Sequence, residues 1–371
     1  MNKPRLAALD YMRGIAMLGV IAIHVGSQYL TNPSANMHLT ALFEIVSRFS
    51  VPIFFFISGF GLFYNLDIED VDYKKFYRRR FKAVLIPYLV WSLFYMLHNA
   101  ILYHDFAVFT PARFFCNLFF GFSSYQLYFL VILLWFYLLM PCWVKVVKNS
   151  VGPNLLFLLA FQLTFNYYSS YSLVPDKITA NPFFHMLLDY RMNYWIFHYI
   201  YIFVLGGFWA YHFDEFMEFL KMRVLMTGFF LVTLCGILGY YYYLIFETGY
   251  SLESAINTAH QLSPIGVFYT IAASLFFFML FTYTQIPEKI AALLHTLGHH
   301  SYFMYLVHPL FITYMTILLQ KAGLIMTAPI AIVYYFVIVI LSFLAAKICR
   351  QLGEKIPKFN QLTIGVSPKK K

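Results

Sequence analysis

Two ionisable residues, Arg13 and His24, lie inside the first apolar segment of the chain. A charge at mid-bilayer costs about 2.5–3.5 kcal/mol on insertion scales, so such residues face the interior of a helix bundle and are functional candidates. The two positions are eleven apart, which is about three helical turns, so their side chains share one helix face about 16 Å apart along the axis. They would line one cleft. The alternative is an arginine that reaches the headgroups and a histidine capped by a neighbouring helix.

A second polar set follows near residue 300. Ser301, Tyr305 and His308 have the i, i+4, i+7 spacing, so a hydroxyl, a phenol and an imidazole point the same way. We expect this face to meet the Arg13–His24 face. Interhelical hydrogen bonding that packs the bundle is the alternative for Tyr302 and Tyr305.

A basic run, Arg78, Arg79 and Arg80, supplies planar and permanently charged donors that match phosphate oxygens. Basic residues beside apolar segments also set membrane orientation, so a topology signal is the alternative for each of the three.

The elements that position these residues are membrane helices. The chain of 371 residues is 61% hydrophobic and only 11% charged, with a mean hydropathy of +0.68, which is too apolar for a soluble domain of this size. Windows of about 20 apolar residues are long enough to cross the hydrocarbon core. Ten such windows predict an all-α bundle: 9–30, 43–64, 82–103, 125–146, 152–171, 194–213, 224–246, 263–283, 300–320 and 328–348.

Positive charge predicts the orientation of this bundle. With a cytoplasmic N-terminus, about 20 of the 26 basic residues fall on the inside, including Lys3, the Arg78–Arg80 run and the tail from Lys347 to Lys371. Five remain outside: Arg48, Arg113, Lys177, Arg191 and Lys321. We therefore expect both termini in the cytoplasm, a single domain over 1–371, and a basic tail over about 349–371.

Several other classes of protein are disfavoured. The net charge of +10 is not accompanied by a basic face or an aromatic RNA motif, so we expect no nucleic-acid partner. The four cysteines are scattered and the histidines have no metal-ligand spacing, so we expect neither a disulfide framework nor a bound metal. Arg13 interrupts the first apolar run and no clear cleavage site follows, so we expect a retained helix instead of a signal peptide.

Four blocks of sequence resemble the acyltransferase-3 family of bacterial membrane proteins. They are the first helix with Leu9-Asp10-Tyr11-Met12-Arg13-Gly14-Ile15-Ala16 and His24, the segment Phe54-Phe55-Phe56-Ile57-Ser58-Gly59-Phe60, the basic loop before Ile86-Pro87-Tyr88, and Leu297-Gly298-His299-His300-Ser301-Tyr302 through Tyr305-Leu306-Val307-His308-Pro309. They occur in the family's order and span residues 9 to 309.

This resemblance implies a membrane-embedded enzyme of the bacterial inner membrane, with no bound cofactor. Its donor would be cytoplasmic acetyl-CoA or another acyl-CoA, and its acceptor a hydroxyl of an envelope polysaccharide or lipid-linked glycan. His24 would then be the general base and Arg13 the residue that binds CoA or orients the thioester. The arginine run would bind the CoA phosphates. The substrate cleft would include Asp10, Ser58, Ser301, Tyr302, Tyr305 and His308, although Ser58-Gly59 suits close helix packing equally well.

One position departs from the family pattern. Relatives often carry His where this chain has Gln126, so any role of that histidine is in doubt here. The surrounding Tyr125-Gln126-Leu127-Tyr128-Phe129 looks more like the branch that modifies biofilm poly-N-acetylglucosamine than like the O-antigen branch. That branch would have a polysaccharide synthase or export complex as a partner.

Two other functions fit an intramembrane Arg and His. A proton-coupled transporter or flippase of an envelope glycan would use the same residue types, but no internal repeat typical of many transporters is visible. A catalytically inactive scaffold would be expected to lack the Arg or the His, and both are present.

Overall fold

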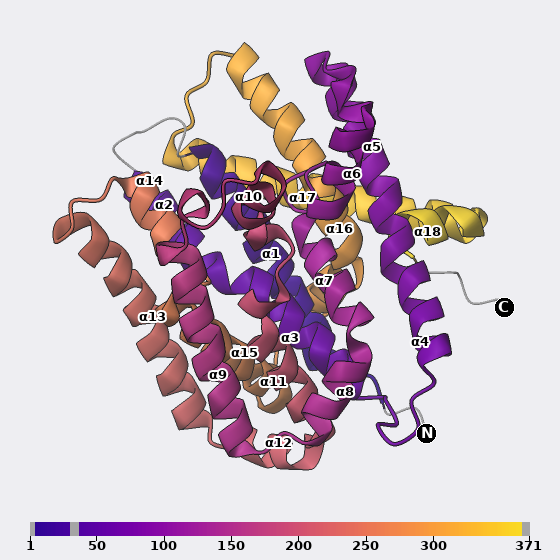
Figure 1. The fold of residues 1–371 in the computed structure, drawn as a ribbon, viewed down its shortest axis with the longest axis vertical. Coiled ribbons are helices and arrows are strands. Elements are labelled where there is room, and N and C mark those ends of the chain that lie inside the picture. Colours follow the sequence, from indigo (N-terminus) through magenta and orange to yellow (C-terminus); the bar gives the residue numbers. More distant parts are fainter. Residues whose placement is uncertain (1–3, 30–36, 366–371) are drawn as a thin grey trace.

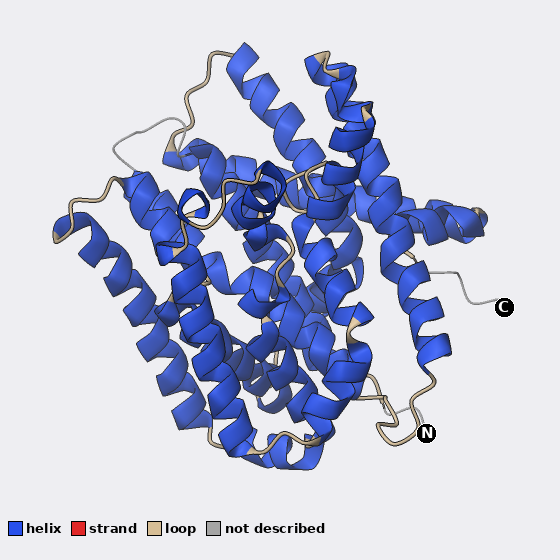
Figure 2. Cartoon of the chain, in the orientation of Figure 1, coloured by secondary structure: helices blue, strands red, loops and turns tan. Residues whose placement is uncertain are grey.

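The structure is a computed structural model that describes residues 4–29 and 37–365. Across these two ranges the chain forms helices joined by loops and turns, and no strand (Figure 2). The predicted all-α fold is therefore confirmed. Lys3 and the last three lysines, which entered the charge count, lie outside the described residues.

Within the described ranges, seven helical stretches are long and apolar enough to cross a membrane. They are α1 (Ala7–Tyr29), α2 and α3 (Met37–Val46 and Ser50–Phe63, joined by the 3-10 turn Ser47–Phe49), α4 and α5 (Tyr73–Arg80 and Ile86–Tyr103, joined by the π-helical turn Phe81–Leu85), α13 (Arg223–Phe246), α15 (Pro264–Tyr283), α16 (Glu288–Lys321) and α17 (Ala328–Lys355).

An eighth crossing is formed if α7 (Tyr128–Leu138) and α8 (Met140–Lys148) are counted as one span bent by 67°. Pro141 near the start of α8 explains the break, because proline lacks an N–H and disfavours helix in the residue before it. The predicted windows 152–171 and 194–213 form α9 (Gly152–Tyr167) and α11 (Ile200–Tyr211), which are shorter. Each of the ten windows thus contains helix, while the number of spans stays a prediction.

The remaining α-helices are short; in the sequence, four of them lie between longer helices and α18 follows α17. They are α6 (Pro111–Phe120), α10 (Pro182–Asp189), α12 (Phe213–Leu220), α14 (Leu252–Thr258) and α18 (Pro357–Ile364). Figure 1 places α6, α10 and α14 toward one end of the bundle and α12 at the other.

Helix α1 lies at the centre of the bundle and packs along α16. The two backbones meet closely because both helices present glycine at the crossing. A Cβ on Gly298 would overlap the backbone carbonyl of Asp10, and one on Gly14 would lie 2.7 Å from the carbonyl oxygen of Leu294. Small residues allow this close contact between membrane helices. Helix α3 packs on α11 in the same way, with Gly59 against the carbonyl of Phe203.

The basic loops gather at the end of the bundle that holds α4, α8 and α12 (Figure 1). The Lys148 ammonium at the end of α8 bonds Glu69 in the α3–α4 loop at 2.5 Å, and the Tyr283 hydroxyl donates to the Met217 carbonyl of α12 at 2.7 Å. We call this the basic end. The positive-inside rule predicts that it is cytoplasmic.

Candidate active site

Arg13 is held by a carboxylate one turn before it on α1. Its Nη1 donates to Oδ1 of Asp10 at 2.9 Å, and the Arg5 Nη2 donates to the same oxygen at 3.0 Å. The Asp10 side chain is 2% exposed, whereas that of Arg13 is 34% exposed. Because two guanidinium groups share one carboxylate, the cluster keeps a net positive charge, which suits an anionic ligand.

This cluster forms one wall of a cavity of about 590 Å³ at the basic end, which we call the basic cavity. Helix α4 forms the facing wall with Lys75, Arg79 and Arg80. The lining contains five cations, namely these three with Arg5 and Arg13, against the two carboxylates of Asp10 and Asp72. Such an excess of cations in a concave site attracts phosphates.

The three arginines of α4 take different positions. Arg79 and Arg80 line the basic cavity, and Arg78 does not. The Arg80 guanidinium lies 5.6 Å from the ring centre of Phe76 and 5.4 Å from that of Tyr137, so two cation–π contacts orient it. Arg78 is exposed.

A second cavity of about 280 Å³ begins at the same cluster, since Arg5, Asp10 and Arg13 line it too. We call it the tyrosine cavity. Helix α3 contributes Phe54 and Ser58, α7 contributes Phe129, Leu130 and Leu133, and α16 contributes Gly298, His299, Ser301, Tyr302 and Tyr305. Ser58 therefore faces this cavity while its neighbour Gly59 packs against α11.

The hydroxyl groups of the tyrosine cavity differ in what they bind. Ser301 donates to the Gly298 carbonyl at 2.8 Å, and Tyr305 donates to the backbone carbonyl of Gln126. The buried Tyr302 hydroxyl has no hydrogen-bond partner within the described residues. Because a buried unpaired hydroxyl is costly, Tyr302 is the hydroxyl here that is free for a ligand.

His24 lies against His308 beyond this cavity. The two imidazole rings stack with centroids 5.3 Å apart, and the Tyr125 ring lies 4.5 Å from His24 on another side. Tyr305 connects this group to the tyrosine cavity, since its ring centre is 6.1 Å from that of His308. Arg13, the tyrosine cavity and the histidine pair thus form a continuous series along α1 and α16.

The hydrogen bonding of His308 fixes its tautomer. Its Nδ1 lies 3.2 Å from the backbone carbonyl oxygen of Met304, and a carbonyl can only accept, so Nδ1 carries the proton in the neutral ring. The Nε2 atom is then an acceptor, and it is buried without a partner in the part of the chain that the structure describes. Pro309 follows directly and lacks the N–H that a helix would donate to the Tyr305 carbonyl.

The chain compares clearly with one protein family. The acyltransferase domain family (acyltransferase 3) matches residues 6–347. The chain belongs to the acyltransferase-3 family. Two relatives from Staphylococcus aureus, strains MRSA252 and MSSA476, are each named "probable poly-beta-1,6-N-acetyl-D-glucosamine export protein". Each is 26% identical over 321 residues, covering 84% of this chain and 83% of the relative. No solved structure matches the chain.

Membership makes this chain a multi-pass membrane acyltransferase. The structure brings eight of the eleven sequence-predicted site residues to the two cavities, and His24 and His308 to the adjacent pair, with Arg78 apart. Their roles stay predictions.

Three residues of this acyltransferase were missed in the sequence. Arg5 shares Asp10 with Arg13, Lys75 lines the basic cavity, and Tyr125 contacts His24. Arg5 and Lys75 are hard to separate from a topology signal. Tyr125 directly precedes Gln126, the position at which this chain departs from the family pattern. That departure is the signal in the sequence that could have drawn attention to Tyr125. Gln126 is buried, and its amide lies 3.4 Å from the Leu306 carbonyl.

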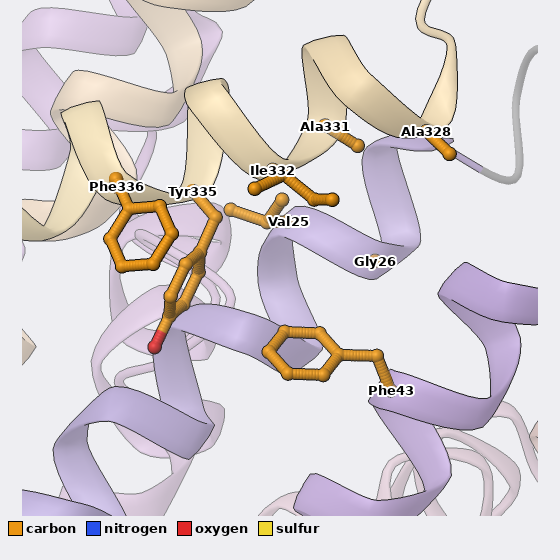
Figure 3. Close-up of a pocket in the computed structure, with 8 residues that line it drawn as sticks. All are labelled: Val25, Gly26, Phe43, Ala328, Ala331, Ile332, Tyr335 and Phe336. Carbon is orange, nitrogen blue, oxygen red and sulfur yellow. The ribbon is translucent and has the colours of Figure 1, made fainter.

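An apolar cavity of about 320 Å³ lies elsewhere in the acyltransferase, between the end of α1, α2 and the start of α17 (Figure 3). Val25, Phe43, Ile332 and Phe336 are among its lining residues, and Phe43, Ile332 and Phe336 are exposed. It contains no titratable side chain other than Tyr335, whose hydroxyl donates to the Leu18 carbonyl at 3.1 Å. This cavity therefore offers no group for acyl transfer.

Among the described residues, no three His, Cys, Asp or Glu side chains gather closely enough to hold a metal ion. The side chains of the series supply imidazole, phenol, hydroxyl, guanidinium and carboxylate groups.

Proposed function

We propose that this acyltransferase moves an acyl group, in the first instance acetyl, from cytoplasmic acyl-CoA to a hydroxyl of an envelope polysaccharide or lipid-linked sugar, in the inner membrane of a bacterial cell. One observation carries the proposal. Arg13 belongs to both the basic cavity and the tyrosine cavity, and the latter leads to the His24–His308 pair. A phosphate-bearing donor with a long neutral arm fits that order.

The donor end supports acyl-CoA. The adenosine phosphate and the pyrophosphate of CoA are polyanions, and Arg79 and Arg80 offer forked donors to them at the basic end. The pantetheine arm is uncharged and carries amides and methyl groups. It would lie along Phe54, Leu130 and Tyr302 in the tyrosine cavity, with the Tyr302 hydroxyl as a hydrogen-bond partner.

In the transfer step, His24 accepts the proton of the sugar hydroxyl as the oxygen attacks the thioester carbon. The C–O bond forms and the C–S bond breaks, and the imidazolium returns the proton to the departing thiolate of CoA. The products are the sugar ester and CoA thiol. Removal of a positioned general base typically costs about 10²–10⁴-fold in rate. Arg13 would stabilise negative charge on the donor.

The His308 ring supports this assignment. It stacks on His24 and occupies one face of the base. Its Nε2 lone pair offers a second acceptor for a hydroxyl proton at the same place.

The names of the staphylococcal relatives suggest the acceptor. They refer to poly-beta-1,6-N-acetyl-D-glucosamine, so we propose a polymer or oligomer of N-acetylglucosamine as the first acceptor to test. Association with a polysaccharide synthase or export complex follows from the same proposal.

The deciding experiment uses the purified full-length protein in lipid nanodiscs with radiolabelled acetyl-CoA and a β-1,6-linked N-acetylglucosamine oligosaccharide. We expect labelled ester on the sugar and stoichiometric CoA thiol, both absent in His24→Ala. Intact acetyl-CoA after prolonged incubation with folded protein and several acceptors would refute the transfer reaction.

Export of the glycan is the second candidate, because it is what the relatives' printed name states. Proteoliposomes loaded with labelled oligosaccharide separate the two functions. An exporter moves the sugar across the bilayer without acetyl-CoA, whereas the acyltransferase modifies it and requires acetyl-CoA.

A further inference from the structure

A polar cavity lies away from the basic end and belongs to neither cavity of the candidate active site. Its volume is about 240 Å³, and its polar lining includes Arg48, Tyr128, Asn193, Tyr199, His260 and Gln261. These residues come from the 3-10 turn Ser47–Phe49, the start of α7, the segment before α11 and the α14–α15 connection. We call it the Arg48 cavity.

The charge in this cavity is balanced. The Arg48 Nη2 lies 2.6 Å from Oε1 of Glu44, and the Glu44 side chain is 4% exposed. Burial, followed by the positive charge of Arg48, lowers the pKa of His260 to about 4, so its imidazole is neutral near pH 7. Since no carboxylate lines the cavity and its one cation is paired, a neutral ligand fits better than a metal ion or a phosphate.

Hydrogen-bonding capacity in the cavity is left unused. Within the described residues, the buried Arg48 Nε and the buried Gln261 Oε1 have no hydrogen-bond partner. The Leu262 N–H donates to Nδ1 of His260 at 2.9 Å, so the Nε2 atom carries the proton of the neutral ring. The cavity therefore offers donors from Arg48 and His260 and an acceptor from Gln261, and Tyr128 and Tyr199 also line it. A pyranose ring presents the complementary hydroxyls and apolar C–H faces.

The position of the cavity connects it with the histidine pair. The turn Ser47–Phe49, which carries Arg48, packs against α1, the helix that carries His24. Tyr128 follows Tyr125 by three residues at the start of α7, and Tyr125 contacts the His24 ring. Two neighbouring segments thus connect the Arg48 cavity with the proposed base, and no residue lines both the Arg48 cavity and the basic cavity.

We propose that the Arg48 cavity binds one neutral pyranose unit of the acceptor and presents a neighbouring hydroxyl to His24. This inference rests on the proposed acyl transfer for its role, although binding of the sugar can be tested without transfer. Gln261 and Tyr128 determine acceptor affinity in this view, and Arg48 orients the ring.

The test compares Gln261→Met with wild type. Methionine keeps the side-chain volume and removes the amide. The matched control is Gln320→Met, which makes the same change at an exposed position on α16. The probe is a β-1,6-linked N-acetylglucosamine hexasaccharide. Its dissociation constant is measured by calorimetry without acetyl-CoA, and its KM is measured with saturating acetyl-CoA. Hydrolysis of acetyl-CoA without sugar reports folding and donor binding.

We expect Gln261→Met to raise both the dissociation constant and the KM for the hexasaccharide about tenfold, as expected for a buried polar group left unpaired, with the KM for acetyl-CoA unchanged. Tyr128→Phe should give a smaller shift in the same direction. If the wild type transfers the acetyl group and neither variant changes the dissociation constant or the KM for the hexasaccharide, the cavity assignment is overturned and the proposed function stands. Hexasaccharide binding that is weakened by Gln261→Met, without any transfer, upholds the cavity and refutes the acyltransferase chemistry. Displacement of the hexasaccharide by inorganic phosphate would show an anion site and overturn the assignment.

Discussion

His24 of α1 and His308 of α16 stack with their ring centroids 5.3 Å apart and their planes 27° from parallel. The two helices bring them together from opposite parts of the sequence. Because the pair adjoins both Tyr125 and the tyrosine cavity, a change in either ring alters the surroundings of the other.

We predict that His24→Gln lowers acyl transfer about 10²–10⁴-fold, because glutamine hydrogen-bonds but does not accept the hydroxyl proton. The donor site lies at the other end of α1, so binding of acetyl-CoA should persist. Transfer by radiolabel and donor affinity by calorimetry are measured on the same preparation. Near-normal transfer by His24→Gln would make His24 a packing residue.

His308→Gln should reduce transfer less, by about 10–100-fold, if His308 positions His24 and does not itself accept the proton. The pH profile separates the roles. A positioning residue shifts the apparent pKa of the profile when it is replaced, whereas loss of a structural residue lowers the rate equally at every pH.

The double variant Arg79→Lys, Arg80→Lys should raise the KM for acetyl-CoA about tenfold or more with a smaller change in kcat. Lysine retains charge and topology but lacks the fork that binds phosphate oxygens. Arg78→Lys is the comparison on the same helix, and less than a twofold change is expected because Arg78 lies outside the basic cavity. Equal effects at all three positions would mean that the cluster acts through general charge.

Gly298→Ala should be strongly destabilising, since its Cβ would overlap the backbone of Asp10 and separate α1 from α16. We expect a loss of about 1–3 kcal/mol and a matching fall in thermal midpoint, measured in nanodiscs. Gly239→Ala on α13 is the matched control, because nothing lies within 4 Å of a Cβ placed there. Its midpoint should be unchanged or slightly higher, as expected for alanine in a helix. Similar midpoints for both variants would contradict the close crossing.

A fifth prediction concerns pH and His260, which lies in the loop before α15. Its pKa is lowered to about 4 in the folded protein by burial and by Arg48, from an ordinary value near 6.5. Between these two pKa values the unfolded state binds more protons than the folded state does. The free energy of unfolding therefore falls as pH is lowered from about 6.5 toward 4.

His260→Asn keeps an acceptor for the Leu262 N–H but does not titrate in this range. We expect the wild type to lose about 1–3 kcal/mol more than the variant between pH 7 and pH 4.5. Thermal midpoints across this range measure the difference. Parallel curves for the two proteins would show that His260 is protonated with an ordinary pKa.

A reporter fused after Lys371 should report cytoplasm, because about 20 of the 26 basic residues fall on that side in the predicted topology. A fusion after Thr248, in the α13–α14 connection, should report the opposite side. An external C-terminus would also move the basic cavity away from the cytoplasmic pool of acyl-CoA.

The helical fold and the family were predictable because hydropathy and short motifs are local properties of the sequence. Arg13 and His24 could be placed on one face from the helical repeat alone. The stacking of His24 on His308 could not be derived with the same certainty, because it depends on the register of α1 against α16. That register is set by Gly14 and Gly298, whose contacts are visible only in three dimensions.

The individual arginines of α4 illustrate a second limit. Arg78, Arg79 and Arg80 are chemically identical and adjacent in sequence, and their directions differ because successive helical positions rotate by about 100°. Only the placement of Phe76 and Tyr137 beside Arg80 identifies which side faces the cavity. The Arg48 cavity was missed for a related reason, since its residues come from four separate segments of the chain.

The glycine crossing has a mechanical consequence. A slide of α1 along α16 by one residue is about 1.5 Å, and it would bring a residue with a side chain to the crossing, where even a Cβ on Gly298 would overlap the Asp10 carbonyl. These two helices carry Arg13, His24, Tyr302 and His308. They therefore hold these four side chains at fixed positions relative to one another. Because α3 is held on α11 by the same kind of contact, we expect any widening that admits the pantetheine arm of the donor to come from α4 and α7, which form facing walls of the cavities. The reacting groups would keep their register during such a change.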